Sequence, residues 1–138
     1  MAEIYIYWFS TALLSLLYLT SAAIYIVKRR WVEQTILGFG YPDYLVPILI
    51  VVKLLAVAAL LSRVSVGLSD LAYAGMLYHL LLSALAHVGV RKPAAALPAL
   101  VGLTLLSTSF LTQNAARQTL SPYAQAWAAH QITLAEWR

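Results

Sequence analysis

The fold is decided by residues 4–27, IYIYWFSTALLSLLYLTSAAIYIV, a stretch that contains no charged side chain and ends at Lys28-Arg29-Arg30. A helix needs about 20 mostly apolar residues to cross a bilayer. No Lys or Arg precedes this stretch, and it is too long for the core of a signal peptide. We therefore expect a retained membrane-spanning helix, with the basic cluster and Trp31 at the level of the lipid headgroups.

Three further apolar stretches are expected to cross the membrane, at residues 44–62, 69–90 and 94–112. Dense Gly and Pro in residues 38–42 end regular structure before the first of them. Ser69 is the expected N-cap of the next, because a Ser side chain satisfies free backbone N–H groups. The connectors are short, so neighbouring helices must be antiparallel. The prediction is an all-α, integral membrane antiparallel four-helix bundle over residues 1–114.

The overall composition agrees with a membrane protein. The chain is 62% hydrophobic and 10% charged, whereas a soluble domain carries about 25% charged residues. Cysteine is absent, which excludes disulfides, thiolate metal sites and a cysteine nucleophile. The net charge of +4 comes from cations at the edges of the apolar stretches. That placement predicts the lipid bilayer as the partner and no nucleic acid.

The last part of the chain, residues 115–138, is a polar tail in which we expect a short amphipathic helix. Its larger side chains recur at spacings of four and three, which places them on one helix face; they are Tyr123, Trp127, His130, Leu134 and Trp137. The first interpretation is a helix lying on the membrane surface. A cap over the bundle and a helix that docks a partner protein are the alternatives.

Basic residues near helix ends predict the orientation in the membrane. The connectors 28–43 and 91–93 lie on one side and hold five Lys or Arg, against Arg63 and Arg117 on the other side. We therefore expect both termini on the non-cytoplasmic side.

Lys53 is the most informative residue, because a charge inside a bilayer costs roughly 2.5–3.5 kcal/mol on insertion. It lies near the middle of its helix, and the hairpin places His79 at the same depth on the next helix. No carboxylate lies at that depth. Lys53 could donate to hydroxyls or carbonyls inside the bundle, with Ser15, Thr104 and Ser107 as the nearest choices. Alternatively it lines a polar pocket for a carbonyl or an anionic group, or it faces lipid.

Three more residues of the 69–90 stretch are candidates for ligand binding. Asp70 lies near the outer helix end and could instead pair with Arg63. Tyr73 could hydrogen-bond a ligand or a neighbouring helix. His87 shares a helix with His79, so paired haem ligation within the chain is not expected. His79 itself shares a face with small residues that predict a helix-packing seam, namely Ala72, Gly75, Ser83 and Ala86. The sequence shows no metal-binding cluster.

Over residues 37–110 the sequence resembles the DoxX-like family. The resemblance rests on a glycine-rich turn with Tyr-Pro, a lysine in mid-helix, an acid followed by Ala-Tyr-Ala-Gly, and a late histidine: Leu37-Gly38-Phe39-Gly40-Tyr41-Pro42, Lys53-Leu54-Leu55, Leu60-Leu61, Asp70-Leu71-Ala72-Tyr73-Ala74-Gly75, Ser83-Ala84 and His87. It implies a four-helix membrane protein. DoxX itself is named as a membrane subunit of a quinone-linked oxidoreductase, and some animal relatives act as assembly factors.

Three functions follow as hypotheses. The first is binding of a quinone or similar lipid-soluble molecule by a subunit of a redox assembly, with Lys53, His79, Tyr73, Asp70 and His87 as candidate ligand-binding residues. The second is a non-enzymatic assembly factor or scaffold. The third is a small membrane enzyme that acts on an apolar substrate by acid-base chemistry. No covalently bound cofactor is expected. Membrane or redox proteins, or further copies of the chain, are the expected protein partners.

Overall fold

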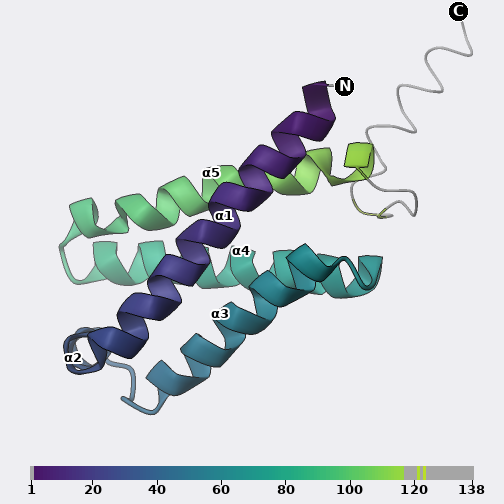
Figure 1. The fold of residues 1–138 in the computed structure, drawn as a ribbon. Helices are drawn as coiled ribbons and strands as arrows, with labels where there is room; N and C mark the ends of the chain where they lie inside the picture. Colours follow the sequence, from purple (N-terminus) through teal and green to yellow (C-terminus); the bar gives the residue numbers. More distant parts are fainter. Residues whose placement is uncertain (1, 117–120, 122, 124–138) are drawn as a thin grey trace, which may run out of the picture.

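The computed structural model describes residues 2–116, 121 and 123, and this part of the chain is helical with short connectors (Figure 1). The elements in chain order are α1 Ala2–Val27, α2 Arg29–Gly38, α3 Leu45–Ser62, α4 Val66–Gly89, the 3₁₀ helix η1 Pro93–Ala96, α5 Leu97–Thr112, and the 3₁₀ helix η2 Gln113–Ala116.

The long helices form a closed ring in which α1 packs against α3 and α5, and α4 packs against the same two helices from the other side. Consecutive long helices run in opposite directions, as the short connectors require (Figure 1). The short helix α2 packs against α3 and α1. The all-α bundle predicted from the sequence is confirmed.

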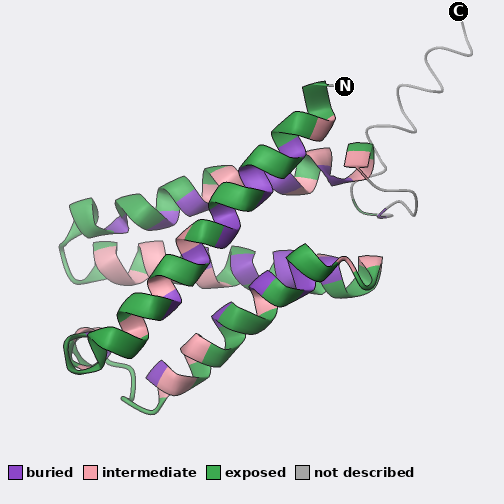
Figure 2. Ribbon diagram, in the orientation of Figure 1, coloured by how far each residue is buried: buried purple, intermediate pink, exposed green. Residues whose placement is uncertain are grey.

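The surface of the bundle is apolar. Large hydrophobic side chains point outward along every long helix, while buried residues follow the inward faces (Figure 2). Within the described residues, four helices are long and apolar enough to cross a membrane, namely Ala2–Val27, Leu45–Ser62, Val66–Gly89 and Pro93–Ala116. Exposed apolar faces of this extent suit hydrocarbon rather than water.

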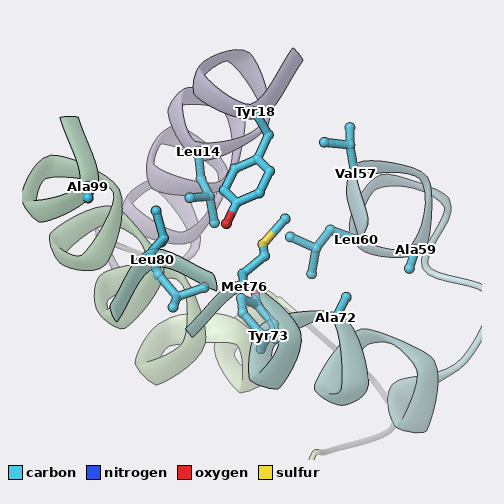
Figure 3. Close-up of a cluster of buried hydrophobic side chains, with 11 residues drawn as sticks. Leu14, Tyr18, Val57, Ala59, Leu60, Ala72, Tyr73, Met76, Leu80 and Ala99 are labelled. Atoms are coloured by element: carbon cyan, nitrogen blue, oxygen red, sulfur yellow. The ribbon is translucent and has the colours of Figure 1, made fainter. Parts of the chain in front are cut away.

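The core lies where α1, α3, α4 and α5 meet (Figure 3). Leu14 and Leu60 are fully buried, and Met76 fills the space between them from α4. At the same level the α5 backbone comes very close to its neighbours. A Cβ atom added at Gly102 would lie 2.9 Å from Leu80 Cδ2 and 3.1 Å from Leu17 Cδ2. A glycine is therefore what lets α5 approach α1 and α4 this closely.

The third long helix, α4, begins earlier in the chain than the predicted N-cap, Ser69. It starts at Val66, and Ser65 is the N-cap, with its hydroxyl accepting a hydrogen bond from the Leu68 backbone N–H at 3.0 Å. Ser69 is buried instead, and its hydroxyl donates to the Ala59 carbonyl at 3.4 Å. Both serines suit a cap chemically, and the three-residue connector leaves only Ser65 outside the helix.

Residues 29–38, expected to be an irregular connector, form the helix α2. Its Val32 and Ile36 are buried against Val46 at the start of α3. Arg29 donates to Glu33 at 2.9 Å, one turn further on. The predicted break comes after this helix, where Gly40 takes the left-handed φ of 89° before the Tyr-Pro pair.

Candidate functional site

Lys53 is inside the bundle. It is 4% exposed, so the lipid-facing interpretation is wrong. Its Nζ donates to the Ser21 hydroxyl at 2.8 Å and lies 4.4 Å from the centroid of the Tyr25 ring and 5.5 Å from that of Tyr18. A cation over an aromatic face is attracted by the ring's electrons. One hydroxyl and two aromatic rings from α1 therefore surround the amine.

The expected partners of Lys53 on α5 do not reach it, because α5 packs on α1 and α4 and lies across the ring from α3. Thr104 and Ser107 instead donate to carbonyls of their own helix, at Leu100 and Leu103. Ser15 is buried on the correct helix, but its hydroxyl makes no hydrogen bond to the described residues.

His79 meets the same group of residues from α4. The Tyr18 hydroxyl and His79 Nδ1 are 3.0 Å apart, and the two ring centroids are 5.6 Å apart. Figure 3 shows the Tyr18 hydroxyl pointing from α1 into the middle of the bundle. The equal depth of Lys53 and His79 is thus seen in the structure, but no direct hydrogen bond joins them within the described part of the chain. Tyr18 connects the two, since its ring faces Lys53 and its hydroxyl bonds His79.

The residues of α1 that complete this site were not predicted from the sequence. Tyr18, Ser21 and Tyr25 follow one another at spacings of three and four, which places them on one helix face. The same spacing extends back through Leu14 and Thr11 to Tyr7, all of them buried. A row of hydroxyl-bearing residues within an apolar helix, interrupted by Leu14, was the available signal. Tyr18, Ser21, Tyr25, Lys53 and His79 are called the central site below.

Tyr73 belongs to a separate cluster nearer the N-terminal end of α4. Its hydroxyl is 2.7 Å from the Ser109 hydroxyl, which is 2.6 Å from that of Thr11. Its ring packs edge-on against Phe110, with centroids 5.4 Å apart. The three hydroxyls link α4, α5 and α1. This favours the interpretation that Tyr73 bonds neighbouring helices.

Asp70 lies closer still to the N-terminal end of α4 and does not pair with Arg63. Its carboxylate accepts hydrogen bonds from the Ser121 hydroxyl at 2.8 Å and from Gln113 Nε2 at 3.3 Å. Arg63 donates to the Ala116 carbonyl and lies over the rings of two aromatic residues of α1, Tyr7 and Trp8. The carboxylate therefore holds the chain that follows α5 against α4. Asp70 is nine residues from His79, or about 13 Å along the helix at 1.5 Å per residue.

His87 lies at the opposite end of α4. Its ring packs edge-on against Phe39, with centroids 4.9 Å apart. It is eight residues from His79, or about 12 Å along the helix. Of the five candidates, the structure therefore places Lys53 and His79 together and the other three elsewhere. No group of three His, Asp or Glu that could hold a metal ion occurs within the described residues.

The predicted seam of small residues on α4 is only partly a packing face. Ala72 is buried, but Gly75 is exposed and a Cβ added to it would meet nothing within 4 Å. Gly75 therefore points away from the other helices.

Comparison with known proteins gives one finding. The model of the DoxX-like family matches residues 9–109, which cover α3, α4, most of α1 and α5, and the central site. The chain belongs to the DoxX-like family. No curated protein and no solved structure matches the chain.

This DoxX-like protein is therefore an integral, multi-pass membrane protein. The family match includes the central site and the Thr11, Ser109 and Tyr73 cluster. It ends before Gln113 and Ser121, the partners of Asp70. The predicted tail helix lies almost entirely outside the described residues, and Tyr123, the described member of its stripe, is exposed. The orientation of the termini stays a prediction.

Proposed function

We propose that this DoxX-like protein binds a quinone, or a similar lipid-soluble carbonyl compound, at the central site, as a subunit of a redox assembly. The observation that carries the proposal is a buried lysine with one hydroxyl acceptor and aromatic rings beside it, at bilayer depth. An ammonium group has three N–H donors, and among the described residues one of them is used by Ser21. A quinone oxygen is an acceptor that a second donor could bind.

The surroundings of Lys53 suit the ring of such a ligand. Tyr18 and Tyr25 offer aromatic faces, and the hydrogen-bonded Tyr18–His79 pair keeps one polar hydrogen for a ligand, on the Tyr18 hydroxyl or on His79 Nε2 according to the histidine tautomer. Ligand sites of this kind are largely apolar, with a few polar groups that set orientation. The chain has no cysteine and no metal cluster among its described residues, so a partner protein would supply the electron carrier.

Binding of a short-chain quinone to the purified protein in lipid nanodiscs tests the proposal. Lys53→Met retains length and apolar packing but removes the donor. A hydrogen bond from a charged donor contributes about 1.5–3 kcal/mol, so quinone affinity should fall by roughly 10- to 100-fold. The matched control is Lys92→Met, which changes an exposed lysine in the connector after α4. Unchanged quinone binding by Lys53→Met would contradict the proposal.

A second variant separates binding from packing. Tyr18→Phe removes one hydroxyl that bonds His79 and leaves the ring in place. It should weaken quinone binding, while Tyr78→Phe on the exposed face of α4 should not. The two substitutions make the same chemical change and differ only in their position in the bundle.

The assembly-factor hypothesis is the second candidate, and one observation favours it. The hydrogen bond to Ser21 and the two tyrosine rings already accommodate the lysine within the chain. If the protein is an assembly factor, Lys53→Met should raise its thermal stability and leave its association with partner proteins intact, and no quinone should bind. The acid-base enzyme hypothesis is weakened, because Asp70, His79 and His87 are each more than two helical turns apart.

A further inference from the structure

A hollow of about 410 Å³ lies at the junction of α1 and α2 and is lined by Ile24, Lys28 and Trp31. The three residues follow at spacings of four and three, so they share one face where the chain passes from one helix to the next. Ile24 is 40% exposed and Trp31 is 61% exposed. The hollow is therefore open to the surroundings of the protein rather than enclosed in the bundle, and it is remote in sequence from Lys53.

Each lining residue suits a different layer of the membrane. Ile24 belongs to the last turn of a membrane-spanning helix, where acyl chains lie. Lys28 follows the end of that helix, at the level of the headgroups. Tryptophan is enriched at the boundary between them, because its ring is apolar and its N–H is polar. The three side chains thus match the three parts of one phospholipid molecule, namely acyl chain, phosphate and glycerol region.

The charges nearby favour an anionic headgroup. Arg29 is paired with Glu33. Lys28 and Arg30 form neither an ion pair nor a side-chain hydrogen bond with any residue that the structure describes. An unpaired cation at the headgroup level attracts anionic lipids. A neutral, zwitterionic headgroup would bring a second cation to the same place.

From this geometry we propose that the hollow binds one anionic phospholipid, with its phosphate at Lys28, its glycerol region beside Trp31 and an acyl chain along Ile24. The hollow shares no lining residue with the central site, although Ile24 adjoins Tyr25 in the chain, and the proposal does not require a quinone. A free phosphate shares the first of these contacts but not the other two, so the lipid is the occupant to which the proposal commits.

Trp31 itself can report the occupant. In a variant with Phe at the other three tryptophans, Trp8, Trp127 and Trp137, the tryptophan fluorescence, excited selectively over that of tyrosine, comes from Trp31 alone. The protein is placed in vesicles of equimolar phosphatidylcholine and phosphatidylglycerol, with bromine, which quenches indole fluorescence, on the acyl chains of one lipid or the other. We expect brominated phosphatidylglycerol to quench more strongly, with a preference of about fivefold, the contribution of one cation near a membrane surface.

Three variants assign that preference to the hollow. Lys28→Gln should abolish it, whereas Lys28→Arg and Lys92→Gln should retain it. Quenching by brominated phosphatidylcholine should persist in Lys28→Gln, which shows that Trp31 is still at the membrane. Equal quenching by the two lipids in the parent protein would overturn the proposal. The proposal would also be overturned if Lys28→Gln and Lys92→Gln lost the preference for phosphatidylglycerol equally, because that result would indicate an effect of general surface charge. Added inorganic phosphate should have no effect, and relief of quenching by it would identify a site for free anions instead.

Discussion

Replacing Gly102 by Ala tests how tightly the bundle is packed at the level of the central site. The new Cβ atom would lie 2.9 Å and 3.3 Å from the two terminal methyl groups of Leu80, and 3.1 Å from a methyl of Leu17. Ordinary contacts between carbon atoms are about 3.5–4.0 Å. Leu80 is 5% exposed and belongs to the buried core, so the Leu80 and Leu17 methyl groups have to shift within a packed interior.

Gly75→Ala is the matched control, because it makes the same chemical change within α4, where the added methyl meets nothing. Ala is favoured over Gly inside a helix by about 1 kcal/mol, and this gain applies to both variants. Overpacking a core costs about 1–3 kcal/mol, and this cost applies to Gly102→Ala alone. We therefore expect Gly75→Ala to raise the free energy of unfolding by up to about 1 kcal/mol. The free energy of unfolding of Gly102→Ala should be lower than that of Gly75→Ala by about 1–3 kcal/mol.

The difference between the two variants is the quantity to measure. Reversible unfolding in mixed micelles, followed by circular dichroism at increasing denaturing detergent, gives both free energies under the same conditions. If Gly102→Ala proves as stable as Gly75→Ala, the close approach of α5 to α1 and α4 is wrong.

Three further predictions address other parts of the chain. Ser109→Ala should lower the free energy of unfolding by about 1–3 kcal/mol, because it removes the partner of the buried Thr11 hydroxyl and one partner of the Tyr73 hydroxyl. Thr108→Ala, at an exposed hydroxyl bonded within its own helix, is the control in the same unfolding assay. Ser121→Ala should cost about 1.5–3 kcal/mol, the contribution of a hydrogen bond to a charged group. No change in its unfolding midpoint would show that the chain after α5 is not held to the bundle by this contact. With both termini outside, a cysteine at Arg30 should resist an impermeant thiol reagent in intact cells and one at Ser65 should react, and the opposite labelling pattern would reverse the orientation.

The span count and the depth of Lys53 were predictable, because bilayer thickness sets helix length and a short connector sets the register of a hairpin. The rotation of each helix about its axis was harder to predict. Lipid is as apolar as the core, so an apolar face does not indicate which side is buried. Gly75 illustrates the difficulty, since its spacing from other small residues predicted that it lies in a packing seam, whereas the structure places it on the outside.

The partners of Lys53 and the helix α2 were missed for different reasons. Ser21 lies on a helix distant in sequence, and its selection depends on which face of α1 turns toward α3. The helix α2 is too short to span a membrane, and its stability comes from burying Val32 and Ile36 against α3. Neither contact is local, so propensity and hydropathy carry no information about it.

All the residues that contact the Lys53 amine described above belong to α1, and this has a consequence for membrane insertion. During synthesis α1 leaves the ribosome before α3, so Ser21 and the two tyrosine rings can already be in the bilayer when the lysine arrives. Even with Lys53 included, α3 has the highest mean hydropathy of the four spans, which offsets the cost of inserting a charge on the helix as a whole. Changes on the inner face of α1 should therefore show their effect two helices later, as failed or delayed integration of α3.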